Sequence, residues 1–203
     1  MAVQVYTFHV SYEGLEHKIW RELKVSSNYR MNQLGYTILV AFDTLAYHLF
    51  QFRFRDQDYV IPHSNFPKDA FDMGQFRLSQ LSLQMNEGME MIYDFGTMQT
   101  FRIELVGVEE MKKGWGRKYP LISDGAGMGI IDDMPVFELK EMVEQIDRNG
   151  RTNSPFYYRD RMRPWDYRCF LIHCVNVLLK EEVRMIEEDY SYFWMEDFSI
   201  KRR

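Results

Sequence analysis

The sequence predicts an α+β fold, in which a mixed or antiparallel sheet is covered by an amphipathic helix and followed by a C-terminal helical extension. Three observations support this prediction. Apolar and polar residues alternate near the N-terminus and again in the middle of the chain, which is the period of half-buried strands. Other segments repeat apolar residues every three or four positions, as amphipathic helices do. Strands and helices do not alternate regularly, so a parallel βαβ fold is not expected.

Two strand-like runs open the chain. Val3 to Tyr12 and Ile19 to Val25 each place their apolar side chains on one face, and Gly14 lies between them. We therefore expect an antiparallel hairpin. Arg21 falls on the apolar side of the second run, where an unpaired charge is very costly. Its guanidinium is expected to reach the sheet edge or a carboxylate, for which Asp94 is a candidate.

A helix and a further strand are predicted next. Ser26 to Asn28 can supply a helix cap, and Met31 to Ala46 carries apolar residues at helical spacing. Leu49 to Arg55 then alternates phenylalanine with glutamine and arginine, which predicts a strand with one wet face. The helix is expected to lie on the sheet and shield its apolar side.

The middle of the chain predicts a second hairpin that leads into a glycine-rich loop. Met89 to Phe95 and Gln99 to Val108 alternate as strands, and Gly96 is the expected positive-φ residue of their turn. Lys118 to Asp133 is rich in glycine and ends in paired aspartates, so we interpret it as a loop.

Helices dominate the predicted C-terminal third. Phe137 to Ile146 and Trp165 to Glu188 show helical periodicity on either side of an irregular connector. The expected organisation is one α+β domain over residues 1–148 and a helical extension packed on it over residues 149–203.

Composition limits the function classes. With 203 residues and 46% hydrophobic residues the chain can bury a core, and its net charge of -5 disfavours a whole-surface attraction to nucleic acid or anionic membrane. It shows neither a signal-peptide pattern nor an apolar run of the length that spans a bilayer. Cys169 and Cys174 are spaced so that they cannot easily bridge within a helix. A cytoplasmic location and no membrane partner are therefore expected.

Several short motifs occur in an order that resembles a known family. They are Ile19-Trp-Arg21, His48-Leu-Phe-Gln-Phe52, Leu78-Ser-Gln-Leu81, Tyr93-Asp-Phe-Gly96, Ile103-Glu-Leu105, and Tyr119-Pro with Asp124-Gly-Ala126. Together they resemble the plasmid pRiA4b open-reading-frame-3-like family over roughly residues 3 to 148. The resemblance implies a compact α+β domain of unsettled biochemical function, often found as a passenger of mobile elements.

The chain departs from the family pattern at positions that bear on metal binding. The family commonly has a Trp-Glu-His sequence after its Tyr-Asp-Phe-Gly motif, whereas this chain has Thr97 to Phe101. It often has a second histidine where Phe50 stands, and Cys-Pro-Pro-Glu-Asp where Gly129 to Asp133 stands. A metal site built on the family's histidines and cysteine is therefore not expected here.

Two other sets of residues could hold a metal ion. Asp124, Asp132 and Asp133 offer carboxylates that suit calcium or magnesium, although the favoured interpretation is a solvated turn that caps the next helix. Cys169 and His173 share one predicted helical face and could hold zinc if further ligands converge. Alternatively, Cys169 packs as a small apolar residue and binds no metal.

The clearest candidate binding surface is the connector Phe156 to Arg168, which interleaves arginines with aromatic residues. Its binding candidates are Tyr157, Arg161, Arg163 and Trp165, to which Arg21, His48 and Asp94 are added from the domain. This composition suits phosphates, stacked bases or a protein partner. The acidic segment Glu181 to Asp197 could instead satisfy the arginines within the chain.

The expected function is a non-catalytic interaction module associated with mobile elements, with a protein partner or a homodimer formed through the C-terminal segment. The aromatic cluster Tyr190 to Met195 in that segment is expected to pack on the domain or on a second copy of the chain. One alternative is a nucleic-acid-associated accessory protein. The other is a metal-dependent hydrolase that uses Asp124, Asp132, Asp133 and His48. No nucleophile-elbow pattern is present, so no catalytic residue and no cofactor are assigned, and the question of enzymatic activity stays open.

Overall fold

The computed structural model describes residues 2–62, 69–158 and 163–200, with side chains described up to Ser191. Its centre is an eight-stranded sheet in the order β5-β4-β3-β6-β7-β1-β2-β8. The strands are β1 Gln4–Tyr12, β2 Trp20–Ser26, β3 Phe50–Phe54, β4 Gln57–Val60, β5 Phe71–Asp72, β6 Gly88–Tyr93, β7 Gln99–Glu110 and β8 Leu121–Ala126. All neighbours are antiparallel except the parallel pair β4 and β5, so the sheet is mixed and the predicted α+β class is confirmed.

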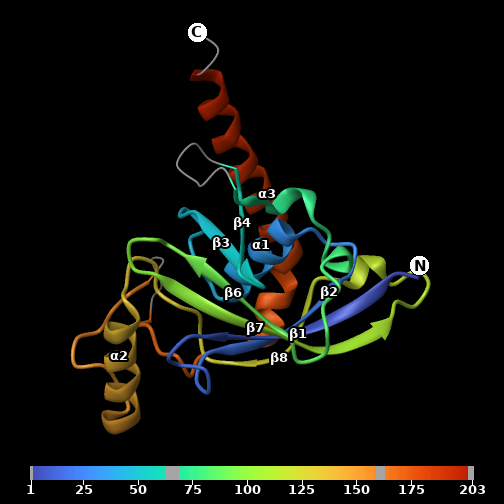
Figure 1. Cartoon of the computed structure of the whole chain (residues 1–203). Helices are drawn as coiled ribbons and strands as arrows, with labels where there is room; N and C mark the ends of the chain where they lie inside the picture. Colours follow the sequence, from blue (N-terminus) through green and yellow to red (C-terminus); the bar gives the residue numbers. More distant parts are fainter. Residues whose placement is uncertain (1, 63–68, 159–162, 201–203) are drawn as a thin grey trace.

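Helices α1 and α3 lie together on one face of the sheet, whereas α2 stands apart at one end of it (Figure 1). The helices are α1 Met31–Ala41, α2 Val136–Asn149 and α3 Ile172–Ile200. Short 3-10 turns occupy Met73–Gln75, Leu78–Gln80 and Gly116–Lys118. Among the described residues, none of the helices is long and apolar enough to cross a bilayer.

The apolar alternation seen in the sequence forms the core between the sheet and α1. Phe8, Val10, Phe52 and Phe101 are 0% exposed, as expected for the covered face. Gly35 lets α1 approach β3 closely, because a Cβ atom there would overlap the ring of Phe50. The predicted shielding of the sheet by this helix is confirmed.

Turn geometry differs from the prediction at two places. Helix α1 ends at Ala41, not at Ala46, and the chain then turns through left-handed residues that include Asp43 (φ 58°) and Ala46 (φ 55°). In the β6–β7 hairpin the positive φ values belong to Asp94 (φ 52°) and Met98 (φ 53°), and not to Gly96. The Asp94 carboxylate accepts the Gly96 N–H at 3.0 Å, a local bond that lets aspartate tolerate this conformation.

Two further boundaries are corrected. The glycine-rich segment before the paired aspartates is not all loop, since Leu121–Ala126 forms edge strand β8 and pairs with β2. Helix α3 begins at Ile172 and not at Trp165. The residues 163–171 before it form an irregular connecting segment, which we call the strap. Glycine and aspartate hid the strand because both are rare in strand interiors.

Candidate functional site

A histidine and two aspartates meet at one end of the sheet. Strand β3 starts and strand β6 ends there, because the two are antiparallel with Phe50 opposite Tyr93. His48 lies just before β3 and Asp94 just after β6, and the Asp94 N–H donates to the Leu49 carbonyl at 3.2 Å. The loop that follows β8 crosses the same end and brings Asp133 to them.

The ring of His48 lies between two carboxylates. Its Nε2 is 2.8 Å from Asp133 Oδ1, and its Nδ1 is 3.8 Å from Asp94 Oδ1. One ligand atom from each of the three residues can be chosen so that all lie within 4.8 Å of one another. The Asp94 side chain is 7% exposed and that of Asp133 is 62% exposed, so the cluster has a buried floor and opens to solvent.

Asp132 fixes the loop beneath this cluster. Its carboxylate accepts hydrogen bonds from the Leu45 N–H at 2.9 Å, from the Tyr93 hydroxyl at 2.5 Å and from the Tyr158 hydroxyl. The residue is 7% exposed, and these donors occupy its oxygens. Asp132 therefore anchors the loop, and the next residue, Asp133, is directed outward with φ 60°.

Gln99 and Tyr190 hold the site from two other sides. The Gln99 side-chain amide donates to the carbonyls of Ile131 at 2.8 Å and Met134 at 3.0 Å. The Tyr190 hydroxyl on α3 donates to the His48 carbonyl, and its ring packs 5.6 Å from that of Phe50. Helix α3 thus contributes directly to the position of His48.

Hydrogen bonding keeps the exposed carboxylate ionised. The Tyr47 hydroxyl donates to Asp133, and this bond, with a further one from His48, lowers the pKa of the Asp133 carboxyl. Burial, together with the same bond, raises the pKa of Tyr47, so its proton stays on the phenol. Tyr12 is fully buried, and its hydroxyl has no hydrogen-bond partner in the described part of the chain. Burial raises the pKa of Tyr12, and the nearby negative charges of Glu13 and Asp94 raise it further.

The geometry favours a cation at this place. A neutral imidazole carries one N–H and one lone pair, so it can donate to only one of the two carboxylates that face it. The other nitrogen presents its lone pair towards a carboxylate oxygen, and a cation among the three residues would be attracted to both groups. Mixed nitrogen and carboxylate donors suit zinc, manganese or iron.

The residues of this cluster lie within a segment that is similar to a known protein family. The family described as plasmid pRiA4b ORF-3-like protein matches residues 4–175. The chain belongs to this family. The match extends beyond residue 148, so the strap and the first residues of α3 are also family sequence. The family carries no established function.

The chain is also similar in fold to a solved structure. It is the crystal structure of MM3350, a protein of unknown function from Methanosarcina mazei Go1, with a TM-score of 0.63 and 22% sequence identity. The similarity covers 74% of this chain and 85% of that one. At this identity it shows the fold alone. Among curated proteins, none matches the chain significantly.

The loop aspartates do not gather as the sequence suggested. Asp124 is exposed on edge strand β8, and Asp132 is occupied by its donors, so of the three only Asp133 joins a group that could hold a metal. Its partners are His48, just before β3, and Asp94, just after β6. Within the described ranges, Cys169 and His173 belong to no such group, and Cys169 precedes the helix that was expected to align them.

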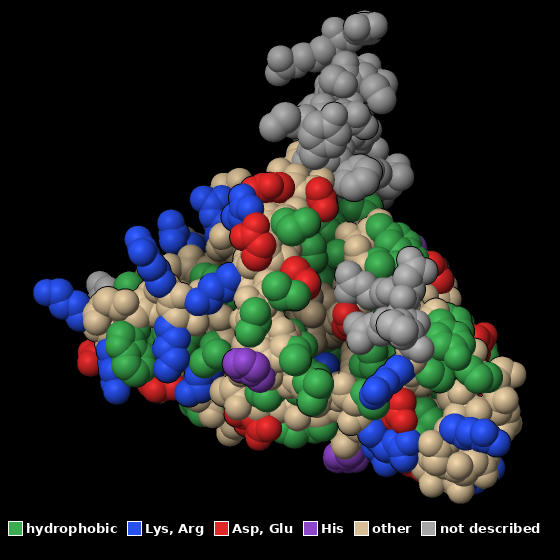
Figure 2. Space-filling model, turned by 180° about the vertical axis from the view of Figure 1, so that it is seen from behind, with side chains coloured by type: hydrophobic (Ala, Val, Ile, Leu, Met, Phe, Trp, Pro, Cys, Tyr) green, Lys and Arg blue, Asp and Glu red, His purple; other side chains and the backbone are tan. Residues whose placement is uncertain are grey.

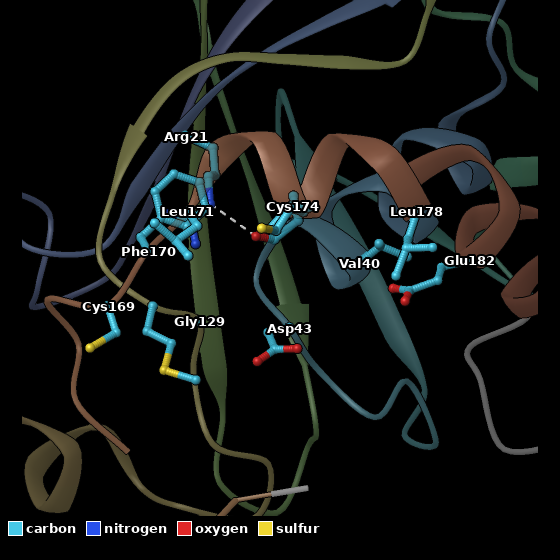
Figure 3. A pocket seen from close by; sticks show the side chains of 13 residues that line it. Arg21, Val40, Asp43, Gly129, Cys169, Phe170, Leu171, Cys174, Leu178 and Glu182 are labelled. Carbon is cyan, nitrogen blue, oxygen red and sulfur yellow. Dashed lines mark hydrogen bonds between the residues drawn. The ribbon is translucent and has the colours of Figure 1, made fainter. Parts of the chain in front are cut away.

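Arg21 is buried as predicted but does not pair with Asp94. Its guanidinium donates to the carbonyls of Ala41 at 2.9 Å, Trp20 at 2.7 Å and Ala126 at 2.6 Å. The centre of the Phe170 ring lies 3.7 Å from the guanidinium carbon, and both side chains line a groove of about 400 Å³ beneath the start of α3 (Figure 3). Burial lowers the pKa of Arg21 to about 9, which leaves it charged at neutral pH. Backbone carbonyls, and not the predicted carboxylate, solvate this charge.

The connector before α3 is a strap, and its expected aromatic surface is only partly present. Trp165 is 2% exposed and packs in the core, so it cannot contact a partner directly. Tyr158 is buried and binds Asp132, whereas Tyr157 is 56% exposed and Arg163 is exposed. Arg161 lies outside the described residues.

The tyrosines of the site were missed by sequence reasoning. Tyr47 and Tyr93 flank His48 and Asp94 in the chain, so adjacency to those motif residues was an available signal. Tyr158 and Tyr190 carried no such signal, because only the tertiary fold brings them to Asp132 and His48.

Proposed function

We propose that the protein binds one divalent cation at His48, Asp94 and Asp133 and that it is a metal-dependent hydrolase. The observation that carries this proposal is the placement of both His48 ring nitrogens against carboxylate oxygens. Ligand atoms of a zinc centre lie about 2.0–2.2 Å from the ion and hence roughly 3–4 Å from one another. The ligand atoms of this cluster lie within 4.8 Å of one another, so a cation would draw them closer. Asp94 would share with the cation the oxygens that accept from the Gly96 N–H and the Thr97 hydroxyl.

The chemistry suits hydrolysis more than structural metal binding. Three protein ligands leave coordination positions for water and substrate, and a bound cation lowers the pKa of that water. Asp133 opens the site to solvent, while Tyr47 places a protonated hydroxyl beside it. The single proton of this hydroxyl is donated to Asp133, so Tyr47 positions that carboxylate for the cation. In this proposal Asp94 is a metal ligand, whereas Asp124 and Asp132, which the sequence had suggested as ligands, are not.

Calorimetric titration tests the proposal. EDTA-treated protein is titrated with Zn²⁺ and with Mn²⁺, and Asp133→Asn is expected to weaken binding by roughly 100-fold because it removes one ligand charge. Asp133 is exposed, so this change should leave the fold intact. The matched control is Asp124→Asn, which changes an exposed aspartate of edge strand β8 outside the cluster and should bind like the wild type.

Hydrolysis is measured on the same proteins. Release of p-nitrophenol from p-nitrophenyl phosphate should require added metal and should be lost in Asp133→Asn. Equal affinities for Asp133→Asn and Asp124→Asn would refute the cation site. Tight binding at the cluster without turnover of phosphate, carboxyl or peptide esters would retain the cation site and remove the hydrolase.

A non-catalytic interaction module is the second candidate function, and a specific observation favours it. Helix α3 exposes the apolar side chains of Val177 at 66%, Leu178 at 53% and Met185 at 52%, and Leu171, just before the helix, is 65% exposed. A second copy of the chain would cover this face and give a homodimer. A monomeric mass by light scattering at micromolar concentration would count against it. The association with mobile elements stays a prediction from the family resemblance.

A further inference from the structure

In the connection between β7 and β8, all charged side chains are positive, and they surround one tryptophan. Residues 112–118 include Lys112, Lys113, Arg117 and Lys118, all of them exposed, and contain no acidic residue. Trp115 lies among them and is 40% exposed. We refer to residues 112–118 as the basic loop. Its cations form no ion pair within the part of the chain that the structure describes.

The tryptophan is held by its basic neighbours. Lys112 Nζ lies 4.6 Å and Lys118 Nζ 4.2 Å from the centre of the Trp115 ring. The backbone N–H of Trp115 donates to the Lys112 carbonyl at 3.0 Å, and that of Lys118 donates to the Trp115 carbonyl at 2.8 Å. Cation–π contacts of this kind contribute about 0.5–1 kcal/mol each at exposed sites. The ring and its surrounding charges are therefore arranged before any ligand binds.

A hollow beside the loop extends the basic surface towards α3. It has a volume of about 450 Å³, and Arg117, Lys180 and Glu187 are among the residues that line it. The Lys180 ammonium donates to the Arg117 carbonyl and so joins α3 to the basic loop. Figure 2 shows Lys and Arg side chains gathered at the edge of the molecule formed by this end of the sheet.

Acidic residues border this surface and limit what can bind it. Glu109 pairs with Lys24 at 2.5 Å, and Arg184 on α3 is held by Glu181 at 2.5 Å and Glu188 at 2.8 Å. A long rigid duplex laid across the region would meet these acids on a chain whose net charge is already -5. A short flexible strand can contact the basic loop alone.

We propose that the basic loop binds a short stretch of single-stranded nucleic acid. One base stacks on the exposed Trp115 ring in place of one of the two lysine ammonium groups that lie over it. The neighbouring phosphates contact Lys112, Lys113, Arg117 and Lys118. An aromatic face surrounded by cations matches both parts of a nucleotide at once, without reading its sequence. This site lies outside the His48 cluster and outside the connector from Phe156 to Arg168.

Fluorescence anisotropy with a fluorescein-labelled oligothymidylate tests the proposal. The titrations are run in EDTA, so that the cation site does not contribute, at KCl concentrations between roughly 50 and 200 mM. With about four phosphate contacts, a plot of the logarithm of the association constant against the logarithm of the KCl concentration should have a slope of roughly -3. Trp115→Ala should weaken binding by roughly 5- to 100-fold, because stacking of one base is lost.

Matched variants keep the outcome decisive. Lys113→Ala should weaken binding and lower the salt slope by about one contact, whereas Arg148→Ala, which removes an exposed cation on α2, should change neither. Trp115→Phe keeps an aromatic face and should retain most of the affinity. Absent binding at the lowest salt, or the same loss in Arg148→Ala as in Lys113→Ala, would overturn the proposal. Binding to phosphatidylserine vesicles but not to the oligonucleotide would assign the loop to lipid and overturn it equally.

Discussion

Replacing Asp132 with alanine is expected to lower the free energy of unfolding by about 3–5 kcal/mol. The carboxylate is the common acceptor for the hydroxyls of Tyr93 and Tyr158 and for the N–H of Leu45. Tyr93 is 0% exposed and Tyr158 is 6% exposed, so water does not readily replace the lost acceptor. Each buried donor left unsatisfied costs about 1–3 kcal/mol.

Urea unfolding followed by circular dichroism measures this loss, and the neighbouring residue provides its control. Asp133→Asn removes an exposed charge with a residue type that tolerates the φ of 60° at this position, and it should cost less than about 1 kcal/mol. The two adjacent aspartates are thus expected to have different roles, with Asp132 governing stability and Asp133 governing cation binding. Equal unfolding midpoints for Asp132→Ala and Asp133→Asn would show that Asp132 is not the anchor of this loop.

Replacing Gly129 with alanine is expected to destabilise the protein by roughly 3 kcal/mol or more. A Cβ atom at this position would overlap the carbonyl oxygen of Phe42 and lie 2.6 Å from Asp43 Cβ. The obstacle is backbone, which cannot rotate away as a side chain can. The contact also carries a hydrogen bond, since the Ile130 N–H donates to the Phe42 carbonyl at 3.0 Å.

Thermal and urea unfolding of Gly129→Ala can be compared with Gly116→Ala. At Gly116 an added Cβ would meet only the Met111 sulfur, at 3.9 Å, so a change within about 0.5 kcal/mol is expected. A wild-type unfolding curve for Gly129→Ala would contradict the close approach. The family resemblance places a cysteine at this position, and the tight packing explains why this chain has no room for that side chain.

Much of the fold could be predicted because its signal is local. The alternation of phenylalanine with polar residues around Phe52 marks a half-buried strand, and the helical spacing from Met31 marks the helix that covers it. Strand β8 was missed because Asp124 and Gly125 resemble a turn, although pairing with β2 holds them in the sheet. Tertiary pairing overrode local propensity there.

The site could be predicted only in part, because its members come from distant segments. His48 and Asp94 were named as candidates, since both lie in motifs at the ends of predicted strands. Which aspartate of the pair would reach them depended on the loop geometry, which buries Asp132 and turns Asp133 outward. Composition alone likewise could not show that Trp165 is buried while Trp115 is exposed.

Anomalous diffraction from a crystal soaked in Zn²⁺ and measured at the zinc edge tests the cation site most directly. The site described here predicts one dominant peak about 2.0–2.3 Å from a His48 ring nitrogen and from carboxylate oxygens of Asp94 and Asp133. The peak should vanish in Asp133→Asn crystals. A dominant peak at Asp124 or at Cys169 and His173, or no peak at the cluster, would contradict it.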